Sequence, residues 1–517
     1  MFNSMRKNCL VAFFVLVSMQ WITVALAVET RLSGHVEAQL RYFPSDPLEP
    51  SEFISLPFIS LRITEAEDDT VFYSFAIQPE WRYQTQDRKH DFAMVPFARY
   101  DVKDQERTNI DMRELYWLYH GEGWEALVGI DRVFWSVAES RHLVNIINQI
   151  DFAEDPDEED QLGQPMVRLT VDVRPILKFL WDAAPKYKKP KIHTKTVLRR
   201  NRNIPTGELA FSKMNGMRLS RFLAVSPRTM RVRVEEEVEE TDEGGNWGKL
   251  SVFLMPGFRT RTFPEHEGRL RGPMPIDEDE EEFVDGASQD RVDFALRYSH
   301  TIDRWSIGLH YFHGNSREPY MRGEGILSNL SNVSSNSGDS QAIAQYAHLI
   351  PENIRLIPYY ELIDQGGIDL QYTGDVWLGK LETIVRDGQG ETFTAVVAGF
   401  EYTIYQAFDS NLDWGLLMEY LHDDRDDEAP TTTFQDDLFF GTRLSFNDVQ
   451  STQILAGYMM DLETDEYSFN LEAERRITNN ISAELLLRIF GGAEDPSDRL
   501  YGIEKDDYGQ LSLSYHF

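Results

Sequence analysis

Arginine and carboxylate side chains recur at alternate positions within long stretches whose other positions are apolar or aromatic. Charged rows of this kind could line a water-filled passage, where opposed basic and acidic groups create a transverse field that favours dipolar solutes. The same rows could also form cross-strand ion pairs that hold a wall together, and both roles are compatible. The candidate pore-lining residues are Arg62, Arg82, Arg99, Asp131, Arg297, Glu382, Arg443, Glu474 and Arg488.

A catalytic role has one candidate, the run His422, Asp423 and Asp424, which could supply an acid–base group near the rim of a barrel. Acid–base catalysis needs a histidine aligned with a partner and a reacting group. No nucleophile motif accompanies this run, and a histidine beside two carboxylates arises readily by chance in an acidic chain. We therefore expect no catalytic residue and no enzyme activity.

Clustered carboxylates suggest a second chemistry, the binding of Ca²⁺ or Mg²⁺. The acidic residues gather in three runs, at residues 154–160, 277–282 and 423–428. None of the runs has the glycine-containing ligand spacing of a dedicated calcium loop. We expect them to be solvated outer loops that contact lipopolysaccharide through divalent cations, with no resident metal and no cofactor.

The elements that must position the charged rows are β-strands, because hydrophobicity alternates with period two along almost the whole chain. In residues 71–77 the apolar side chains stand at Val71, Tyr73, Phe75 and Ile77. The apolar rows span about ten residues, longer than the usual strand of a soluble sandwich and long enough to cross a bilayer at a tilt. Lipid cannot satisfy unpaired backbone groups, so such strands must close into a barrel.

The connections alternate in length and give the strand number. Counting back from the C-terminus, short turns near residues 478–480, 447–449, 408–411, 373–375 and 301–303 alternate with long segments at 491–505, 423–433, 313–364 and 259–290. Short inner turns and long outer loops are typical of outer-membrane barrels. We predict an all-β fold: a transmembrane antiparallel β-barrel of 18 strands, with 16 as the alternative, and one non-barrel insertion.

Both termini carry signals of export and assembly. Residues 1–27 read as a signal peptide, with Arg6 and Lys7 before an apolar stretch that ends in Ala25-Leu26-Ala27. The chain ends in alternating residues that include Tyr515 and Phe517. This ending resembles the C-terminal strand of Gram-negative outer-membrane proteins, which implies recognition by the barrel-assembly machinery.

Residues 114–173 carry a closer resemblance. Gly129 in a strand is followed by Phe134-Trp135 and an Asn-rich stretch, and this arrangement resembles porin-like proteins of an uncharacterised Gram-negative family. The resemblance implies that a long loop follows the strand. Asp131 departs from the polar or basic residue expected there, so no selectivity is transferred from the relatives.

This loop, residues 136–165, is predicted to constrict the pore. Apolar residues at 143, 146, 147 and 150 have helical spacing and predict one short helix. The candidate constriction residues are Asn145, Asn148, Gln149 and Asp151. One hypothesis has the helix fold into the lumen and present its amides to the passage; the other has it cap the rim or contact a neighbouring subunit.

The insertion, residues 174–246, is basic up to residue 233 and acidic afterwards, and it interrupts the strand alternation. It divides the barrel into residues 28–173 and 247–517, and counting places it on the periplasmic side. It could bind peptidoglycan, gate the pore from below or bind a periplasmic partner. A disordered segment without a dedicated role is an equal alternative.

The sequence as a whole predicts a porin-like channel in the bacterial outer membrane for passive diffusion of small hydrophilic solutes. A formal charge of −35 over 517 residues argues against a nucleic-acid partner. Expected partners are membrane lipid, lipopolysaccharide, small hydrophilic solutes and the barrel-assembly machinery, with homo-oligomerisation left open. The alternative is a blocked structural barrel whose basic insertion tethers a periplasmic or cell-wall partner.

Overall fold

A computed structural model describes residues 29–46, 70–155, 157–173, 247–265, 268–271, 275–324, 355–494 and 498–517. Three sequence predictions lie outside these residues: the signal peptide over 1–27, the insertion over 174–246 and the pore-lining candidate Arg62. Among the described residues, no helix is long and apolar enough to cross a membrane.

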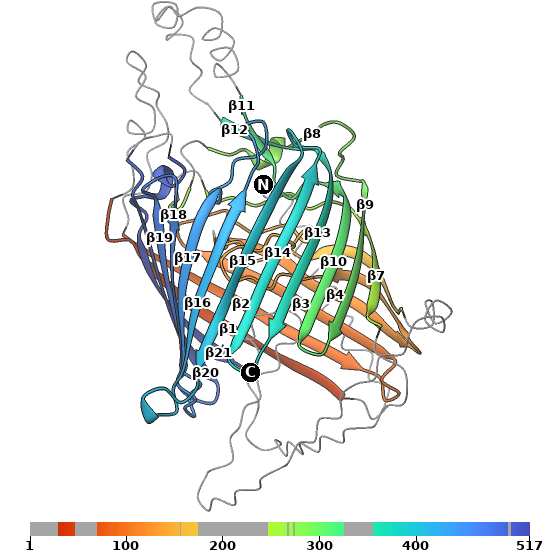
Figure 1. Ribbon diagram of the computed structural model, residues 1–517, viewed down its shortest axis with the longest axis horizontal. Coiled ribbons are helices and arrows are strands. Elements are labelled where there is room, and N and C mark those ends of the chain that lie inside the picture. The colour runs from red at the N-terminus through yellow and green to blue at the C-terminus, as the bar shows by residue number, and fades with distance from the viewer. Residues whose placement is uncertain are drawn as a thin grey trace, which may run out of the picture.

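Eighteen antiparallel strands form one sheet that closes on itself (Figure 1). The first nine are β1 (Glu29–Tyr42), β2 (Val71–Gln84), β3 (His90–Asp101), β4 (Asn109–Gly121), β5 (Trp124–Asp131), β6 (Gln164–Asp172), β7 (Lys249–Pro256), β9 (Val292–Ile302) and β10 (Trp305–Asn315). The others are β13 (Leu362–Thr373), β14 (Trp377–Asp387), β15 (Phe393–Ile404), β16 (Asp413–Asp423), β17 (Asp436–Ser445), β18 (Gln453–Asp461), β19 (Tyr467–Arg476), β20 (Ile481–Gly491) and β21 (Tyr508–His516). The predicted fold and strand number are confirmed.

The sheet has no free edge, because β1 pairs with β2 on one side and with the last strand, β21, on the other. The backbone N–H of Phe517 donates to the carbonyl of Gly34 at 3.0 Å, so pairing continues to the last residue. Tyr515 points outward and is 53% exposed. Its role as an assembly signal, with Phe517, stays a prediction.

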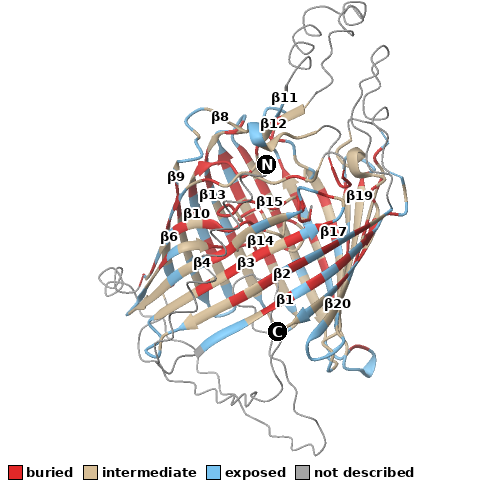
Figure 2. Ribbon diagram, turned by 180° about the vertical axis from the view of Figure 1, so that it is seen from behind, coloured by how far each residue is buried: buried red, intermediate tan, exposed pale blue. Residues whose placement is uncertain are grey.

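Alternation along the strands separates two environments. In β2, Phe72, Ala76 and Glu80 face the lumen and are buried, whereas Tyr73 and Phe75 face outward with 48% and 55% exposure. Figure 2 shows the same alternation of buried and more exposed segments along the strands around the barrel. A barrel whose outer face carries half-exposed Leu, Ile, Val and aromatic side chains on every side requires an apolar surrounding.

The two ends of the barrel differ in their connections. At the turn end, β9 and β10 are joined by residues 303–304 and β14 follows β13 after residues 374–376. The opposite loop end carries several long connections that were predicted from sequence, among them residues 257–291 between β7 and β9 and residues 424–435 between β16 and β17. The insertion enters at the turn end, since it leaves β6 at Asp172 and returns to β7 at Lys249.

A three-stranded sheet at the loop end was not predicted from the sequence. It consists of β8 (Glu282–Phe283), β11 (Tyr320–Glu324) and β12 (Arg355–Tyr360), where β12 pairs parallel with β8. Ion pairs join Asp277 to Arg355 and Glu282 to Arg322. The acidic run 277–282 therefore makes specific contacts and includes the 3-10 helix η3 (Glu278–Glu280).

Candidate functional site

The connection between β5 and β6, residues 132–163, lies inside the barrel and is called the lumen loop (Figure 1). Leu143, Val144, Ile146 and Ile147 are each at most 6% exposed. They pack with inward-facing apolar side chains of the wall, including Phe253, Met255, Phe312, Ile363, Ile384, Leu417 and Phe439. The lumen wall is therefore apolar where these four side chains pack against it.

The helix predicted over residues 143–150 is wrong. This segment consists of turns and bends, and its amide side chains bond to the loop backbone where a helix would bond to itself. Asn145 Oδ1 accepts from the backbone N–H of Trp135 and Ser136 at 2.7 and 3.1 Å. Asn148 Oδ1 accepts from Val133 N at 2.8 Å, and its Nδ2 donates to the carbonyls of residues 131 and 162.

Two carboxylates on the far wall fix the first part of the loop. Glu382 of β14 is completely buried and accepts from Ser136 Oγ and from the backbone N–H of Val137 and Ala138, at 2.5, 2.6 and 2.8 Å. Glu419 of β16 accepts from Ser140 N at 2.8 Å and Ser140 Oγ at 2.6 Å. Charge-assisted bonds of this kind are about twice as strong as neutral ones.

The acidic second part of the loop meets arginines on the opposite wall. Asp155 lies 3.2 Å from Arg41 of β1 and 2.9 Å from Arg488 of β20. Glu154 lies 2.5 Å from Arg99 of β3. The expectation that residues 154–160 form a solvated outer loop is therefore wrong, because the arginine rows of the wall draw these carboxylates into the lumen.

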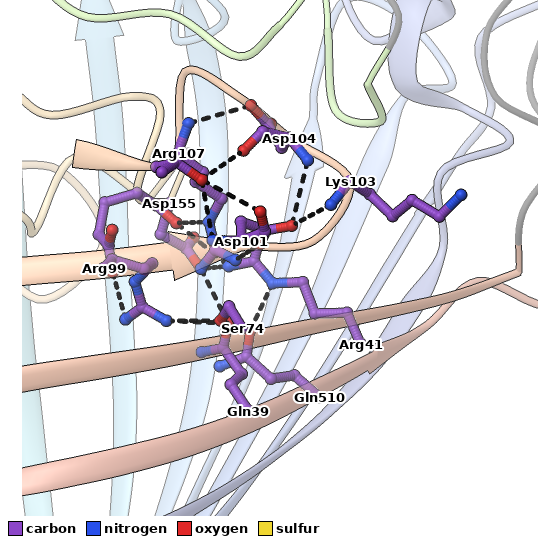
Figure 3. A network of polar contacts seen from close by, with 12 residues as sticks. Gln39, Arg41, Ser74, Arg99, Asp101, Lys103, Asp104, Arg107, Asp155 and Gln510 are labelled. Atoms are coloured by element: carbon purple, nitrogen blue, oxygen red, sulfur yellow. Dashed lines mark hydrogen bonds and ion pairs between the residues drawn. The ribbon is translucent and has the colours of Figure 1, made fainter.

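Figure 3 shows that Arg41, Arg99 and Asp155 belong to one polar network. Arg107 donates to Asp101 at 2.8 Å and to Gln39 at 2.8 Å, and Arg41 donates to Gln510 at 2.5 Å. The arginines Arg41, Arg99 and Arg107 carry 8%, 2% and 4% side-chain exposure. At the loop, four neighbouring arginines outweigh the effect of burial and hold the pKa of Glu154 down at about 2.

Gln149 and Asp151 hold the middle of the lumen loop. Asp151 is 1% exposed, lies 2.7 Å from Arg113 of β4 and accepts from Thr262 Oγ1 at 2.6 Å. Gln149 is also 1% exposed, and its Oε1 accepts from Ile150 N at 3.0 Å. The four constriction candidates therefore anchor the loop, and three of them, Asn148, Gln149 and Asp151, are almost fully buried.

The described pore-lining candidates all lie on inward-facing rows, and most of them are paired. The pairs are Arg82 with Glu114 at 3.0 Å, Asp131 with Arg168 at 3.1 Å, Arg297 with Asp369 at 2.8 Å, Arg443 with Glu139 at 2.9 Å, Arg99 with Glu154, and Arg488 with Asp155 and Asp157. Glu382 binds the loop backbone. Glu474 lies opposite Gln453 and Glu484 in the wall.

An open space remains on one side of the lumen loop. A cavity of about 490 Å³ lies between the loop and the wall formed by β17, β18, β19 and β20. Loop residues such as His142, Phe152 and Glu158 border it on one side, and Ser468 and Asn470 of β19 border it on the other. Its lining also contains the arginines Arg141, Arg261, Arg271, Arg425, Arg488 and Arg499 and the acids Glu139, Asp157, Glu158, Glu159, Glu318, Asp437, Asp461, Glu466 and Glu472.

The catalytic candidate separates into unrelated contacts. His422 Nδ1 lies 2.9 Å from Asp436, whereas Asp423 binds Arg141 and Arg425 at 3.0 and 2.8 Å. No group of three or more His, Cys, Asp and Glu side chains within the described residues is placed to hold a metal ion.

Sequence reasoning missed several residues that organise the lumen. Among them, Arg107 and Arg113 received no role, although both fix the loop to the wall. Their partners in the loop, Glu154 and Asp151, lie 47 and 38 positions away in the sequence. No local pattern marks such pairs.

The fold and lumen define a closed β-barrel with an infolded loop. The chain is similar to Pseudomonas aeruginosa OpdQ (8% identity, TM-score 0.43, 95% of this chain and 99% of that one) and to Pseudomonas aeruginosa OccK11 (OpdR) (8%, 0.43, 95% and 96%). It is also similar to a mutant Rh. blastica porin (9%, 0.35, 95% and 100%). No protein-family model and no curated protein sequence matches the chain.

Proposed function

We propose that the protein is a porin-like channel of the bacterial outer membrane through which small hydrophilic solutes diffuse passively. The observation that carries this proposal is the cavity of about 490 Å³ between the lumen loop and the wall of β17 to β20. It lies inside a barrel of 18 strands, a size that leaves an aqueous channel unless a segment fills it. The apolar outer face supplies the contact with lipid.

The lumen loop is the constricting element in this proposal. It is attached to β14 and β16 through Glu382 and Glu419 and to β1 and β20 through Asp155. Attachment to opposite walls fixes the loop across the lumen and leaves the solute path beside it. Paired charges on the lining keep that path polar, and Ser468 and Asn470 add uncharged polar groups.

Conductance of the purified full-length protein in a planar bilayer tests the proposal. We expect stepwise conductance, and we expect Ser468→Trp to lower it because this side chain borders the cavity. The matched control is Leu471→Trp. This position lies on the same strand but on its outward-facing side, so the variant should leave conductance unchanged. A silent membrane with verified insertion, or equal conductance for both variants, would contradict the proposal.

The alternative is a blocked structural barrel, and the wall-to-wall attachment of the lumen loop is the observation that favours it. In that case the basic insertion tethers a periplasmic or cell-wall partner. Deleting residues 178–233 should leave conductance intact if the insertion is a tether and should change the open probability if it is a gate. Lipopolysaccharide, the barrel-assembly machinery and a second copy of the chain remain proposed partners.

A further inference from the structure

Three carboxylates stand in a row at the loop end of neighbouring strands. Asp437 of β17 lies directly opposite Asp461 of β18 in the register. The backbone N–H of Asp461 donates to the carbonyl of Glu466 at 3.0 Å, so Glu466 continues the row toward β19. All three residues line the cavity beside the lumen loop. We call these residues the acidic row.

The acidic row has few direct ion-pair partners among the described residues. Asp437 is 2% exposed, and its Oδ2 has no hydrogen-bond partner among the described residues. The guanidinium of Arg499 lies 3.7 Å from Asp461, at the long limit of an ion pair. Arg141 lines the same cavity but is bound to Asp423 at 3.0 Å. Among the described residues, the three carboxylates therefore share one direct ion pair, the one with Arg499.

Backbone contacts hold the row in place without neutralising it. Asp461 Oδ1 accepts from the backbone N–H of Glu463 and Thr464 at 2.7 and 2.8 Å. Glu466 Oε1 accepts from the backbone N–H of Leu500 at 2.7 Å. The carboxylates are thus fixed at the border of the cavity, and they do not form a group placed to ligate a metal ion. Fixed charge without a chelating geometry suits a mobile cation.

Like charges directly opposite each other destabilise a sheet unless a counter-charge is present. We propose that the acidic row is a cation-attracting subsite of the passage, which takes a monovalent cation or the ammonium group of a solute. This proposal rests on the proposed channel function. It makes Asp437 and Asp461 determinants of ion preference, because a charged ring or row in a narrow path concentrates ions of the opposite sign.

The reversal potential of the purified channel in a KCl gradient tests the subsite. We expect Asp437→Asn and Asp461→Asn each to lower the ratio of cation to anion permeability by about sevenfold, since a unit charge about 7 Å away in water changes the energy of a cation and of an anion by roughly RT each, with opposite signs. Arg499→Gln removes the nearest cation and should raise the ratio by a similar factor. Asp290→Asn, an exposed site at the loop end that does not line the cavity, is the matched control.

The three variants differ in how strongly they could disturb folding of the barrel. Arg499 lies in an outer connection, so its variant keeps the experiment decisive even if a wall variant fails to fold. Unchanged reversal potentials in Asp437→Asn, Asp461→Asn and Arg499→Gln, with normal conductance, would overturn the subsite and leave the channel standing. A wild-type protein that inserts but does not conduct would overturn the channel function itself.

Discussion

Glu382 holds one end of the lumen loop, and replacing it tests whether this loop sets the size of the passage. Its carboxylate is fully buried and accepts four hydrogen bonds, from Ser136 Oγ, Val137 N, Ala138 N and Val144 N at 2.5, 2.6, 2.8 and 3.3 Å. A hydrogen bond to a charged group contributes about 1.5–3 kcal/mol, and bonds to one acceptor are not additive. We expect Glu382→Ala to weaken loop docking by about 4 kcal/mol, which raises the undocked population about a thousandfold.

Two measurements on the full-length protein report the undocking of the lumen loop in Glu382→Ala. Hydrogen exchange of the amides at residues 137, 138 and 144 should accelerate, and single-channel recordings should show larger or noisier conductance. The control is Glu125→Gln, an inward-facing carboxylate near the turn end whose partner is His120. Unchanged exchange and unchanged conductance in Glu382→Ala would show that the carboxylate does not hold the loop, and the reasoning would be refuted.

Three further predictions concern other parts of the barrel. Asp151→Asn removes the closer of two counter-ions of the buried Arg113, at 2.7 Å, and leaves Asp111 at 3.3 Å, so exchange in the lumen loop should rise by an amount that corresponds to about 2 kcal/mol. Unaltered exchange would count against the ion pair between Asp151 and Arg113. Gly129→Ala should prevent correct assembly, because the backbone has φ of 142° and a Cβ would lie 2.1 Å from a carbonyl oxygen of β4. The measurement is the loss of heat-modifiable migration in gels, and a normally folded variant would contradict the prediction. Burial raises the pKa of Glu278 to about 8, so its carboxyl is protonated in the fold, and the loop-end structure should lose stability as the pH rises from about 4.5 toward 8. Exchange at Phe263 N, which donates to Glu278, should therefore show weaker protection at pH 9 than at pH 6, and Glu278→Gln should remove the difference.

The barrel itself could be predicted from the sequence because its determinants are local. Alternation such as that at Tyr73 and Phe75 specifies which face of a strand meets an apolar surrounding, and this pattern needs no knowledge of the partner strand. Turn residues fix where each strand ends. The number of strands and the presence of short turns and long loops could therefore be predicted as well. The inward direction of Arg82, Arg297 and Arg443 came from the same period of two.

The lumen loop is the main place where sequence reasoning failed. Apolar spacing at residues 143–150 predicted a helix, but Asn145 and Asn148 bond to backbone groups of the same loop, and Glu382 takes the N–H groups that precede them. A helix repeats one local bond, whereas this segment satisfies its backbone through acceptors that are brought close by closure of the barrel. Local periodicity therefore could not distinguish a helix from this non-helical loop segment.

The sequence by itself determined a closed wall with an apolar outside and a charged inside, because side-chain alternation is a property of each strand alone. Only the tertiary structure decided what fills the lumen that this wall encloses. Arg488 and Asp155 are separated by more than 300 residues, and they meet because the barrel places β20 beside the acidic part of the lumen loop. Charge pairing between such distant segments depends on where closure of the barrel places each strand. The paired lumen loop leaves the cavity on the side of β17 to β20.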